Sequence, residues 1–183
     1  MHTRITTLEF LASCSQAVRV IYEHWDRLRA QRRMPKRSDL DPADIVPHLP
    51  GIQLVDVRRE PLDFVYRLVG TREVAERGSD PTGKRVAEHG FGANLHEVLE
   101  NYRHVVAERS VLYDRERFMV PDGRYVQDES LFMPLSEDGQ SVNMVLVYTH
   151  YEDTWRSAVE RMWDAKRAMQ PGARALLQRV TIP

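Results

Sequence analysis

The sequence contains one cysteine, Cys14, among its 183 residues. A single cysteine excludes an internal disulfide, which suits a reducing compartment. Long apolar runs are missing as well: no segment approaches the length of a membrane span, and the N-terminal stretch lacks the apolar core of a signal peptide. We therefore expect a cytoplasmic protein that makes no membrane contact.

An excess of either charge is also absent. The 26 Lys and Arg residues and the 27 Asp and Glu residues leave a formal net charge of -1, which gives the chain no overall attraction to nucleic acid. The basic residues between positions 27 and 37 run directly into Asp39, Asp41 and Asp44, which can neutralise them locally. We expect no nucleic-acid partner, and we interpret Asp41 as the N-cap of a short helix.

The motifs of common enzymes are missing too. The sequence lacks the nucleophile motif G-x-S-x-G and the zinc motif H-E-x-x-H, and its seven histidines are scattered along the chain. Histidines without ligand spacing do not indicate a shared metal. We therefore expect no catalytic site and no metal site.

One stretch imitates a phosphate-binding loop. Residues 78–85 read GSDPTGKR, which matches G-x-x-x-x-G-K, but Arg85 stands where the loop needs Ser or Thr to hold Mg²⁺. The stretch also follows a charged helical turn, whereas a P-loop follows a buried strand. We predict instead a type I turn that begins at Asp80 and ends at Gly83, with Pro81 at its second position.

Apolar residues at helical spacing predict one long helix over residues 7–31. Six of them recur at intervals of three and four, which is the rhythm of a coiled-coil seam. These six residues are Leu11, Cys14, Val18, Ile21, Trp25 and Leu28. Two interpretations stay open, because the helix can lie on the core of its own chain or pair with a second copy. We expect a homodimer to which this dimer seam contributes.

The rest of the chain alternates between strand and helix patterns. Five segments have the apolar pattern of strands: 51–58, 62–70, 111–120, 124–135 and 141–151. The last of these is apolar on both faces, so we expect a central strand that is covered on both sides. Residues 93–110 have the pattern of an amphipathic helix, and residues 153–169 repeat a helical spacing.

This order of elements is that of a PAS domain, and three segments strengthen the resemblance. The stretches MPKRSDLDPADIVPHLPGIQLVDV, DFVYRLVGT and GSDPTGKRV resemble the short single-domain PAS proteins of alphaproteobacteria. The resemblance implies an α+β fold with a five-stranded antiparallel sheet, helices on one face and a small cavity between them. It divides the chain into N-terminal helices over 1–50, a PAS core over 51–151 and a helical tail over 152–183.

The resemblance also implies a function. A PAS domain is expected to be a sensory or signalling module that binds a small organic ligand in its cavity, a protein partner, or both. Because this chain has no room for an effector domain of its own, we expect its output to be a contact with a signalling protein.

The same resemblance makes haem and flavin candidate cofactors. Some PAS domains hold haem through a histidine on the longer helix, and others link a flavin to a reactive cysteine in a helical segment. His104 lies opposite the apolar stripe of its helix and is expected to face water, and Cys14 lies outside the core. We therefore expect neither haem nor flavin.

Six aromatic or sulfur-containing side chains are candidates for the cavity wall. They are Tyr66, Tyr102, Phe118, Phe132, Met144 and Tyr148. Plain core packing explains at least half of them, so the choice among them stays open.

Arg67 is a further cavity candidate, because it alternates with Val65 and so shares an apolar face. A buried guanidinium needs a carboxylate partner or an anionic ligand. A tight hairpin places position 56 opposite position 65, which brings Asp56 one diagonal step from Arg67. A slip of one residue in that register leaves Asp39 or Asp41 as the candidate partner.

Two other classes of protein stay open. A cup-shaped α+β enzyme similar to ketosteroid isomerase needs a carboxylate deep in the cavity with a tyrosine opposite, and Asp128 and Tyr66 are candidates. The strand order fits that class less well. A protein-interaction domain without a ligand is the other alternative, and it would have a filled core.

Overall fold

Six antiparallel strands form one sheet in the order β1-β4-β5-β6-β2-β3. The computed structural model describes residues 3–123 and 125–152. The strands are β1 (Thr3–Ile5), β2 (Ile52–Arg58), β3 (Asp63–Val69), β4 (Leu112–Met119), β5 (Tyr125–Leu135) and β6 (Met144–Glu152). The helices, with 3-10 helices labelled η, are η1 (Leu8–Ala12), α1 (Gln16–Arg29), η2 (Arg37–Asp39), η3 (Pro42–Gly51), α2 (Thr71–Arg77), α3 (Val86–His89) and α4 (Leu95–Glu108).

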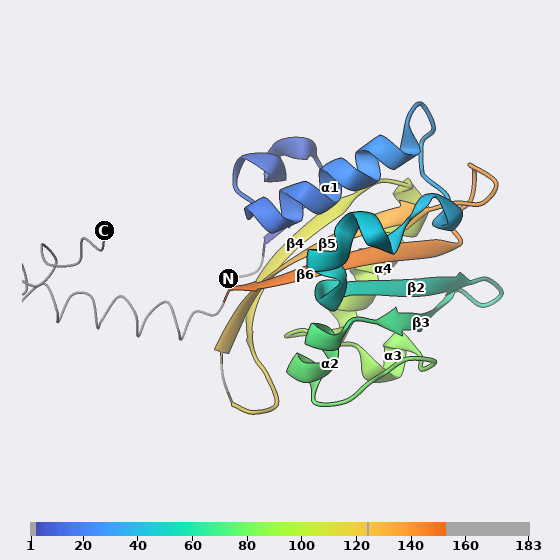
Figure 1. Ribbon diagram of the computed structural model, residues 1–183. Coiled ribbons are helices and arrows are strands. Elements are labelled where there is room, and N and C mark those ends of the chain that lie inside the picture. Colours follow the sequence, from blue (N-terminus) through green and yellow to red (C-terminus); the bar gives the residue numbers. More distant parts are fainter. Residues whose placement is uncertain (1–2, 124, 153–183) are drawn as a thin grey trace, which may run out of the picture. The chain divides into compact units, whose positions relative to one another are not determined.

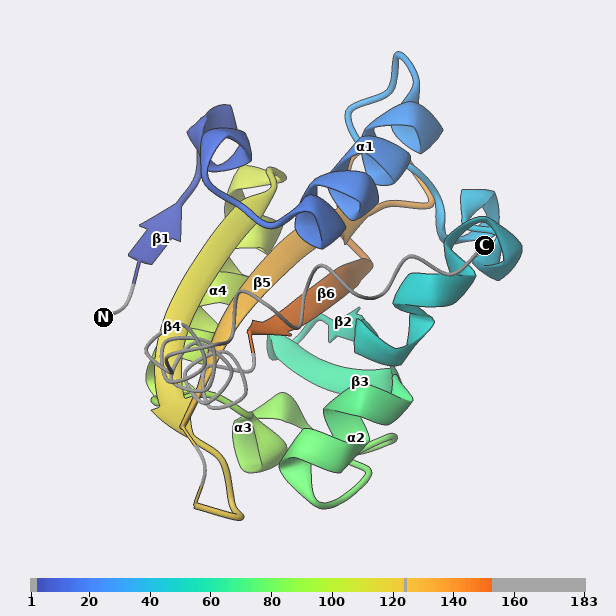
Figure 2. The same ribbon diagram turned by 60° about the vertical axis from the view of Figure 1, so that its left-hand side comes forward.

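Each of the five predicted strands is present, and β1 adds a sixth. In the ladder between β1 and β4, Thr3 pairs with Arg115 and Ile5 pairs with Tyr113. Figure 2 shows β1 beside β4 at the edge of the sheet. The prediction of five strands is therefore wrong by one strand. Three residues are too few for alternation to reveal a strand, because the pattern needs about four to eight.

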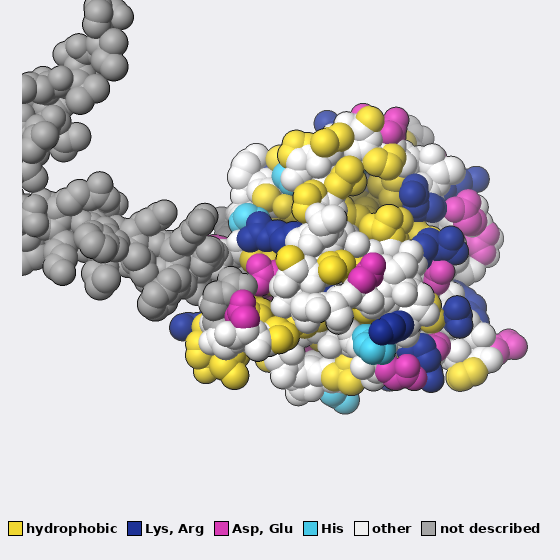
Figure 3. All heavy atoms as spheres, turned by 60° about the horizontal axis from the view of Figure 1, so that its bottom comes forward, with side chains coloured by type: hydrophobic (Ala, Val, Ile, Leu, Met, Phe, Trp, Pro, Cys, Tyr) yellow, Lys and Arg dark blue, Asp and Glu magenta, His cyan; other side chains and the backbone are white. Residues whose placement is uncertain are grey.

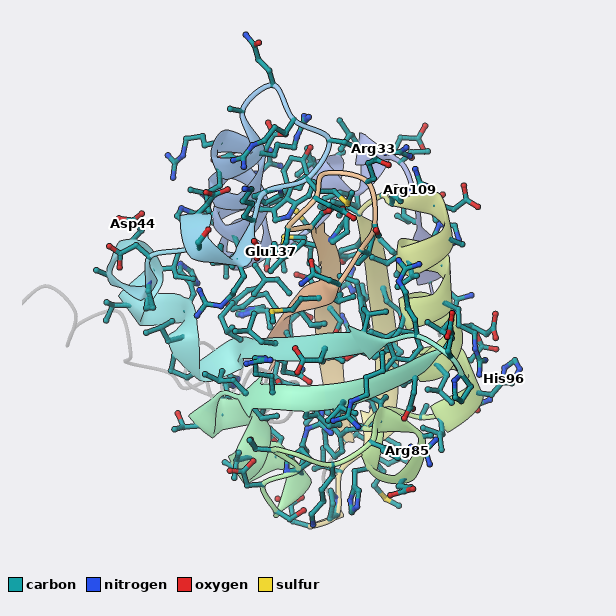
Figure 4. The ribbon with its side chains drawn as sticks, turned by 90° about the vertical axis from the view of Figure 1, so that its right-hand side faces the viewer. Arg33, Asp44, Arg85, His96, Arg109 and Glu137 are labelled. Carbon is teal, nitrogen blue, oxygen red and sulfur yellow. The ribbon has the colours of Figure 1, made fainter. Side chains whose placement is uncertain are left out.

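Helices cover both faces of the sheet (Figure 1). On one face, α1 contacts β5 and β6, and η3 contacts β6. On the other face, α4 contacts β4 and β5, while α3 lies next to the edge strand β3. Figure 4 shows the same layers from the side, with Asp44 of η3 and His96 of α4 on opposite sides of the strands. The expectation of helices on one face is thus wrong.

The predicted long helix over 7–31 is two helices. η1 ends at Ala12, and α1 begins after Ser15, whose hydroxyl accepts a hydrogen bond from the Val18 backbone N–H at 3.3 Å. The Ser15 backbone N–H donates to the buried Glu129 carboxylate of β5 at 2.9 Å. The Ser15 cap, which is hydrogen-bonded to β5, starts a new helix at a point where apolar spacing alone predicts one continuous helix.

Three of the six residues of the predicted dimer seam are buried inside their own chain. Val18, Ile21 and Trp25 belong to a core cluster that also contains residues of β5 and β6. The Trp25 indole N–H donates to the Pro134 carbonyl at 3.1 Å. The other three seam residues, which pack against the same cluster, are Leu11, Cys14 and Leu28. The sheet of the same chain therefore covers Val18, Ile21 and Trp25, and the homodimer stays a prediction.

The expectation for the last strand is confirmed. Met144, Leu146 and Tyr148 of β6 belong to the cluster under α1. Val145 and Val147 belong to a second cluster on the face that carries α4. A strand buried on both faces lies inside the sheet, and β6 pairs with β5 on one side and β2 on the other.

The stretch that imitates a P-loop is a turn. Gly78 ends α2 in the left-handed conformation, and the Asp80 carboxylate accepts a hydrogen bond from the Thr82 backbone N–H at 2.9 Å. The Lys84 backbone N–H donates to the Pro81 carbonyl at 2.9 Å, and Gly83 has a φ of 83°. A turn that begins at Pro81 with a positive φ at its third residue is type II, so the predicted type I turn lies one residue too early. A helix precedes it, as predicted.

None of the helices in the described residues combines the length and the apolar character needed to cross a membrane. The described residues belong to one compact unit that ends at Glu152, and so the segment 3–50 packs with the predicted core. The predicted helical tail over 152–183 lies, apart from its first residue, outside the described residues.

Candidate functional site

A small cavity lies between the sheet and α4, where the PAS resemblance implies one. Its volume is about 30 Å³, enough for about two water molecules. Its walls come from β2 to β6, from α2 and from α4. Most of the lining residues are polar: Gln53, Tyr66, Glu73, Arg77, Asn101, Tyr102, Asp114, Glu116, Asp128, Ser130, Thr149 and Tyr151.

Strands β4 and β5 supply an acidic wall formed by Asp114, Glu116 and Asp128. Asp114 and Glu116 stand two residues apart on β4, so they share a face, and Glu116 lies directly opposite Asp128. All three side chains are buried. The Asp128 carboxylate accepts hydrogen bonds from the Glu116 backbone N–H and from the Ser130 hydroxyl, each at 3.2 Å. Three carboxyl groups therefore share one side of the cavity.

Crowding in the acidic wall changes the protonation of Asp128. Burial, followed by the nearby carboxylates of Glu116 and Asp114, raises the pKa of Asp128 well above its usual value. The hydrogen bonds that Asp128 accepts act in the opposite direction and are weaker. Burial and the acidic wall thus favour the protonated form of Asp128.

An ion pair faces the acidic wall from α2. The buried Glu73 carboxylate accepts a hydrogen bond from the Gln53 amide nitrogen at 2.9 Å and lies 3.6 Å from the Arg77 guanidinium. Burial raises the pKa of Glu73 from 4.5 to about 7, and Arg77 opposes the rise. Arg77 also donates to the Gln53 side-chain oxygen at 3.0 Å and to the Tyr66 hydroxyl at 3.3 Å. The Arg77 guanidinium therefore interacts with Glu73, Gln53 and Tyr66, which lie on or near α2.

Hydroxyl and amide groups connect the two charged regions. The Ser130 and Thr149 hydroxyl oxygens lie 3.0 Å apart, and the Gln53 amide nitrogen donates to Thr149 at 3.4 Å. Gln53 then reaches Glu73, so the chain of hydrogen bonds runs from β5 through β6 and β2 to α2. A buried network of this kind fixes the side chains that it joins.

Helix α4 contributes one amide to the cavity. Asn101 is 1% exposed, and its side-chain nitrogen donates to the Asp114 carboxylate. Its side-chain oxygen has no hydrogen-bond partner among the described residues. A buried acceptor without a donor costs about 1–3 kcal/mol. The lining therefore presents two acceptors that the described part of the protein leaves unmet, the Asn101 side-chain oxygen and Glu73 Oε1.

A larger hollow adjoins this cavity. Its volume is about 180 Å³, and its lining includes Ser79, Pro81 and His89. Arg77 and Phe91 line both spaces, and the Arg77 guanidinium lies 4.9 Å from the centre of the Phe91 ring. These two side chains therefore form the wall between the inner cavity and the outer hollow.

The charges of the cavity differ from those of the surface. On the face shown in Figure 3, Lys and Arg side chains are interspersed with Asp and Glu side chains. Inside, the described lining residues comprise four carboxyl side chains and the single basic side chain of Arg77. Among the described lining residues, acidic side chains thus outnumber basic ones.

A family model described as a PAS domain matches residues 14–148 of the sequence. The chain belongs to the PAS domain family. No curated protein matches the sequence.

The structure is similar to several solved structures of low sequence identity. An RNA-binding light-oxygen-voltage (LOV) receptor is 13% identical, with a TM-score of 0.50 over 92% of this chain and 44% of the receptor. The LOV protein of Rhodobacter sphaeroides is 12% identical, with a TM-score of 0.47 over 78% of this chain and 85% of that protein. This PAS domain spans less than half the length of the RNA-binding receptor.

A LOV domain described with a flavin analogue is a third neighbour, 10% identical, with a TM-score of 0.43 over 68% of this chain and 93% of that domain. The expectation of no flavin cofactor stays a prediction. The volume of the described cavity, about 30 Å³, is far below the roughly 300–1,000 Å³ of small-molecule pockets. Cys14 packs against the cluster on the opposite face of the sheet. His104, the haem candidate, is half-buried rather than exposed as expected, and it is not a lining residue.

The predicted cavity residues divide between several places in the PAS domain. Tyr66, Tyr102 and Phe132 line the cavity. Phe118 is on the same face, but it packs in a separate small cluster with Phe91. The two remaining candidates lie on the opposite face under α1: Met144 and Tyr148. Their assignment to the cavity is wrong, because the alternation of β6 places them on the face of the sheet that α1 covers.

Arg67 is also outside the cavity. The predicted register is confirmed, since Asp56 pairs with Val65, and Arg67 donates to the Asp56 carboxylate at 2.8 Å. The Arg67 side chain is 58% exposed, so its predicted burial is wrong. β3 is an edge strand, and the described helices leave this end of its face open to solvent.

Apart from Asp128, the charged residues of the cavity are not among those that the sequence predicts. β4 reads LYDRERFM, in which acidic and basic residues alternate, so one face is acidic. This alternation is visible in the sequence, but it is also typical of a strand with one face in solvent. Only the position of α4 shows that the acidic face of β4 is buried. Glu73 and Arg77 lie on α2, whose sequence TREVAER reads as a surface helix.

Proposed function

We propose that this PAS domain is a sensory module that recognises a small polar ligand in the cavity between the sheet and α4. One observation carries the proposal: the cavity is lined by buried ionisable groups that share hydrogen bonds. Buried charge is costly unless it is paired, and buried groups with perturbed pKa values concentrate at functional sites. The family match supports a sensory role, and a contact with a signalling protein is part of the same proposal.

The two alternative functions fit less well. Asp128 and Tyr66 do line one cavity, as an enzyme similar to ketosteroid isomerase requires. The family match and the strand order nevertheless favour the PAS fold, whose role is sensory. A ligand-free interaction domain is expected to have a filled apolar core, and the polar lining of this cavity does not favour that reading.

A variant that fills the cavity tests the proposal. Val98 lines the cavity from α4, whereas Val106 packs on the same helix away from it. Val98→Leu adds one methylene to the cavity wall, and Val106→Leu is the matched control. We would measure thermal unfolding with a panel of small cations, anions, neutral polar compounds and apolar compounds. We expect at least one class to raise the Tm of the wild type and of Val106→Leu by several degrees, but not that of Val98→Leu.

Two outcomes would contradict the proposal. In one, no class of compound raises the Tm of the wild type at millimolar concentration. In the other, the same compounds raise the Tm of Val98→Leu by the same amount, which would place binding elsewhere on the protein.

A further inference from the structure

We propose that Phe91 controls access to the ligand site: the ligand enters the inner cavity from the outer hollow, through an opening that the Phe91 side chain closes. The inner cavity is the space of about 30 Å³ between the sheet and α4, and the outer hollow is the adjoining space of about 180 Å³. The inference rests on the proposed function and gives the route by which its ligand arrives.

The first argument is size. The inner cavity has room for about two water molecules, whereas small-molecule sites have volumes of roughly 300–1,000 Å³. The outer hollow is several times larger than the inner cavity. Phe91 and Arg77 line both spaces, so a movement of either side chain would join them. An organic ligand can therefore reach the buried polar groups only when this wall opens.

The second argument is that Arg77 is fixed in place. Its guanidinium lies 3.6 Å from the Glu73 carboxylate and donates to the Gln53 side-chain oxygen at 3.0 Å. It also donates to the Tyr66 hydroxyl at 3.3 Å and to the His89 carbonyl at 3.1 Å. Separating a buried cation from such partners is costly. Arg77 is therefore the stationary side of the wall.

The third argument is that Phe91 is held less tightly. The centre of its ring lies 4.9 Å from the Arg77 guanidinium and 5.2 Å from the centre of the Phe118 ring. The side chain is half-buried, and among the described residues the Phe91 backbone forms no hydrogen bond with another part of the backbone. Phe91 lies between α3 and α4, and the next residue, Gly92, has a φ of 154°, which residues with a Cβ atom rarely adopt. Phe91 can therefore turn aside while Arg77 stays in place.

Chemical labelling of a thiol inside the cavity tests this route. Ser130 is 9% exposed and lines the inner cavity but not the outer hollow. Cys14 is the single cysteine of the sequence, so the double variant Cys14→Ser, Ser130→Cys carries one thiol, at position 130. Methyl methanethiosulfonate is a small thiol reagent that is larger than the closed cavity can admit. Mass spectrometry would follow its reaction with this single-thiol protein.

The labelling rate reports how often the wall opens. Phe91→Ala, added to the single-thiol protein, is expected to raise the rate by about tenfold or more, because reaction at a closed site follows the population of the open form. Phe91→Leu is a milder truncation for the case in which Phe91→Ala folds poorly, and it is expected to raise the rate by a smaller factor.

The matched control is Phe10→Ala in the same single-thiol protein. Phe10 is 1% exposed in the cluster under α1, on the opposite face of the sheet, and it lines neither space. This variant removes a ring of the same size, and we expect its labelling rate to stay within about threefold of that of the single-thiol protein. An equal rise for Phe10→Ala and Phe91→Ala would mean that the reagent enters through unfolding, which would overturn the proposal. Labelling rates that do not change in either Phe91 variant would overturn it as well.

Failure of this inference differs from failure of the proposed function. If a compound raises the Tm of the wild type but not that of Val98→Leu, and labelling is independent of position 91, the cavity is a ligand site with another entrance. If Phe91→Ala speeds labelling but no class of compound raises the Tm of the wild type, the wall opens and the proposed function is wrong.

Discussion

The ionisation of Glu73 makes a quantitative prediction about stability. Glu73 is 1% exposed, and burial raises its pKa from 4.5 to about 7. The folded protein therefore holds a proton on Glu73 over a pH range in which the unfolded chain has released it. Stability that this proton contributes is complete below about pH 4.5 and is lost as the pH rises to about 7. The rise in pKa corresponds to roughly 3 kcal/mol of stability lost across that interval.

Glu73→Gln removes the titration while it keeps the shape of the side chain. The variant leaves Arg77 without its carboxylate, which shifts its stability by a constant amount. The informative quantity is therefore the pH dependence of the difference between the two proteins. We expect the free energy of unfolding of the wild type to fall, relative to Glu73→Gln, by up to about 3 kcal/mol between pH 5 and pH 8.

Urea denaturation at several pH values measures this difference. Other titrating groups affect the wild type and the variant alike and cancel. Glu137→Gln is the control, since Glu137 is exposed in the loop between β5 and β6, and its curve should run parallel to that of the wild type. Parallel curves for Glu73→Gln and the wild type between pH 5 and pH 8 would refute the reasoning.

Two further substitutions test where Ile21 and Arg67 lie. Ile21→Ala should lower the free energy of unfolding by about 2–5 kcal/mol without changing the molar mass in light scattering, because Ile21 is 1% exposed in its own core. The control Leu8→Ala, at a position 59% exposed, should change the free energy of unfolding by no more than about 0.5 kcal/mol. A lower molar mass for Ile21→Ala with unchanged stability would show instead that Ile21 contacts a second copy of the chain. Arg67→Ala should cost less than about 1 kcal/mol in urea denaturation, because its ion pair with Asp56 lies at the surface; a loss above about 2 kcal/mol would show that the pair is buried.

Much of the sheet could be predicted from apolar alternation. β6 carries apolar residues on both faces, and this alone indicated its central place. The pairing of Asp56 with Val65 followed from the tight connection between β2 and β3. These predictions succeed because a two-residue period and a short turn each leave few alternatives.

Other features depend on contacts that a pattern does not contain. The three-four spacing of Val18, Ile21 and Trp25 is the same for a helix on a sheet and for a helix on a helix, so the sequence does not distinguish them. Glu73 reads as a surface residue because its helix is rich in charge. Its burial follows from the position of α2 over Gln53, which lies twenty residues earlier in the chain.

The end of β6 has a consequence for how a signal leaves the domain. Tyr151 lines the cavity, and the next residue, Glu152, is the last of the strand and accepts a hydrogen bond from the Gln127 side chain at 2.9 Å. A residue of the cavity wall and the last residue of β6 are thus adjacent, about 3.3 Å apart along the strand. In the proposed sensory function, a shift of Tyr151 on ligand binding would reach the end of β6 through the backbone alone. Such a signal would need no relay of side chains through the core.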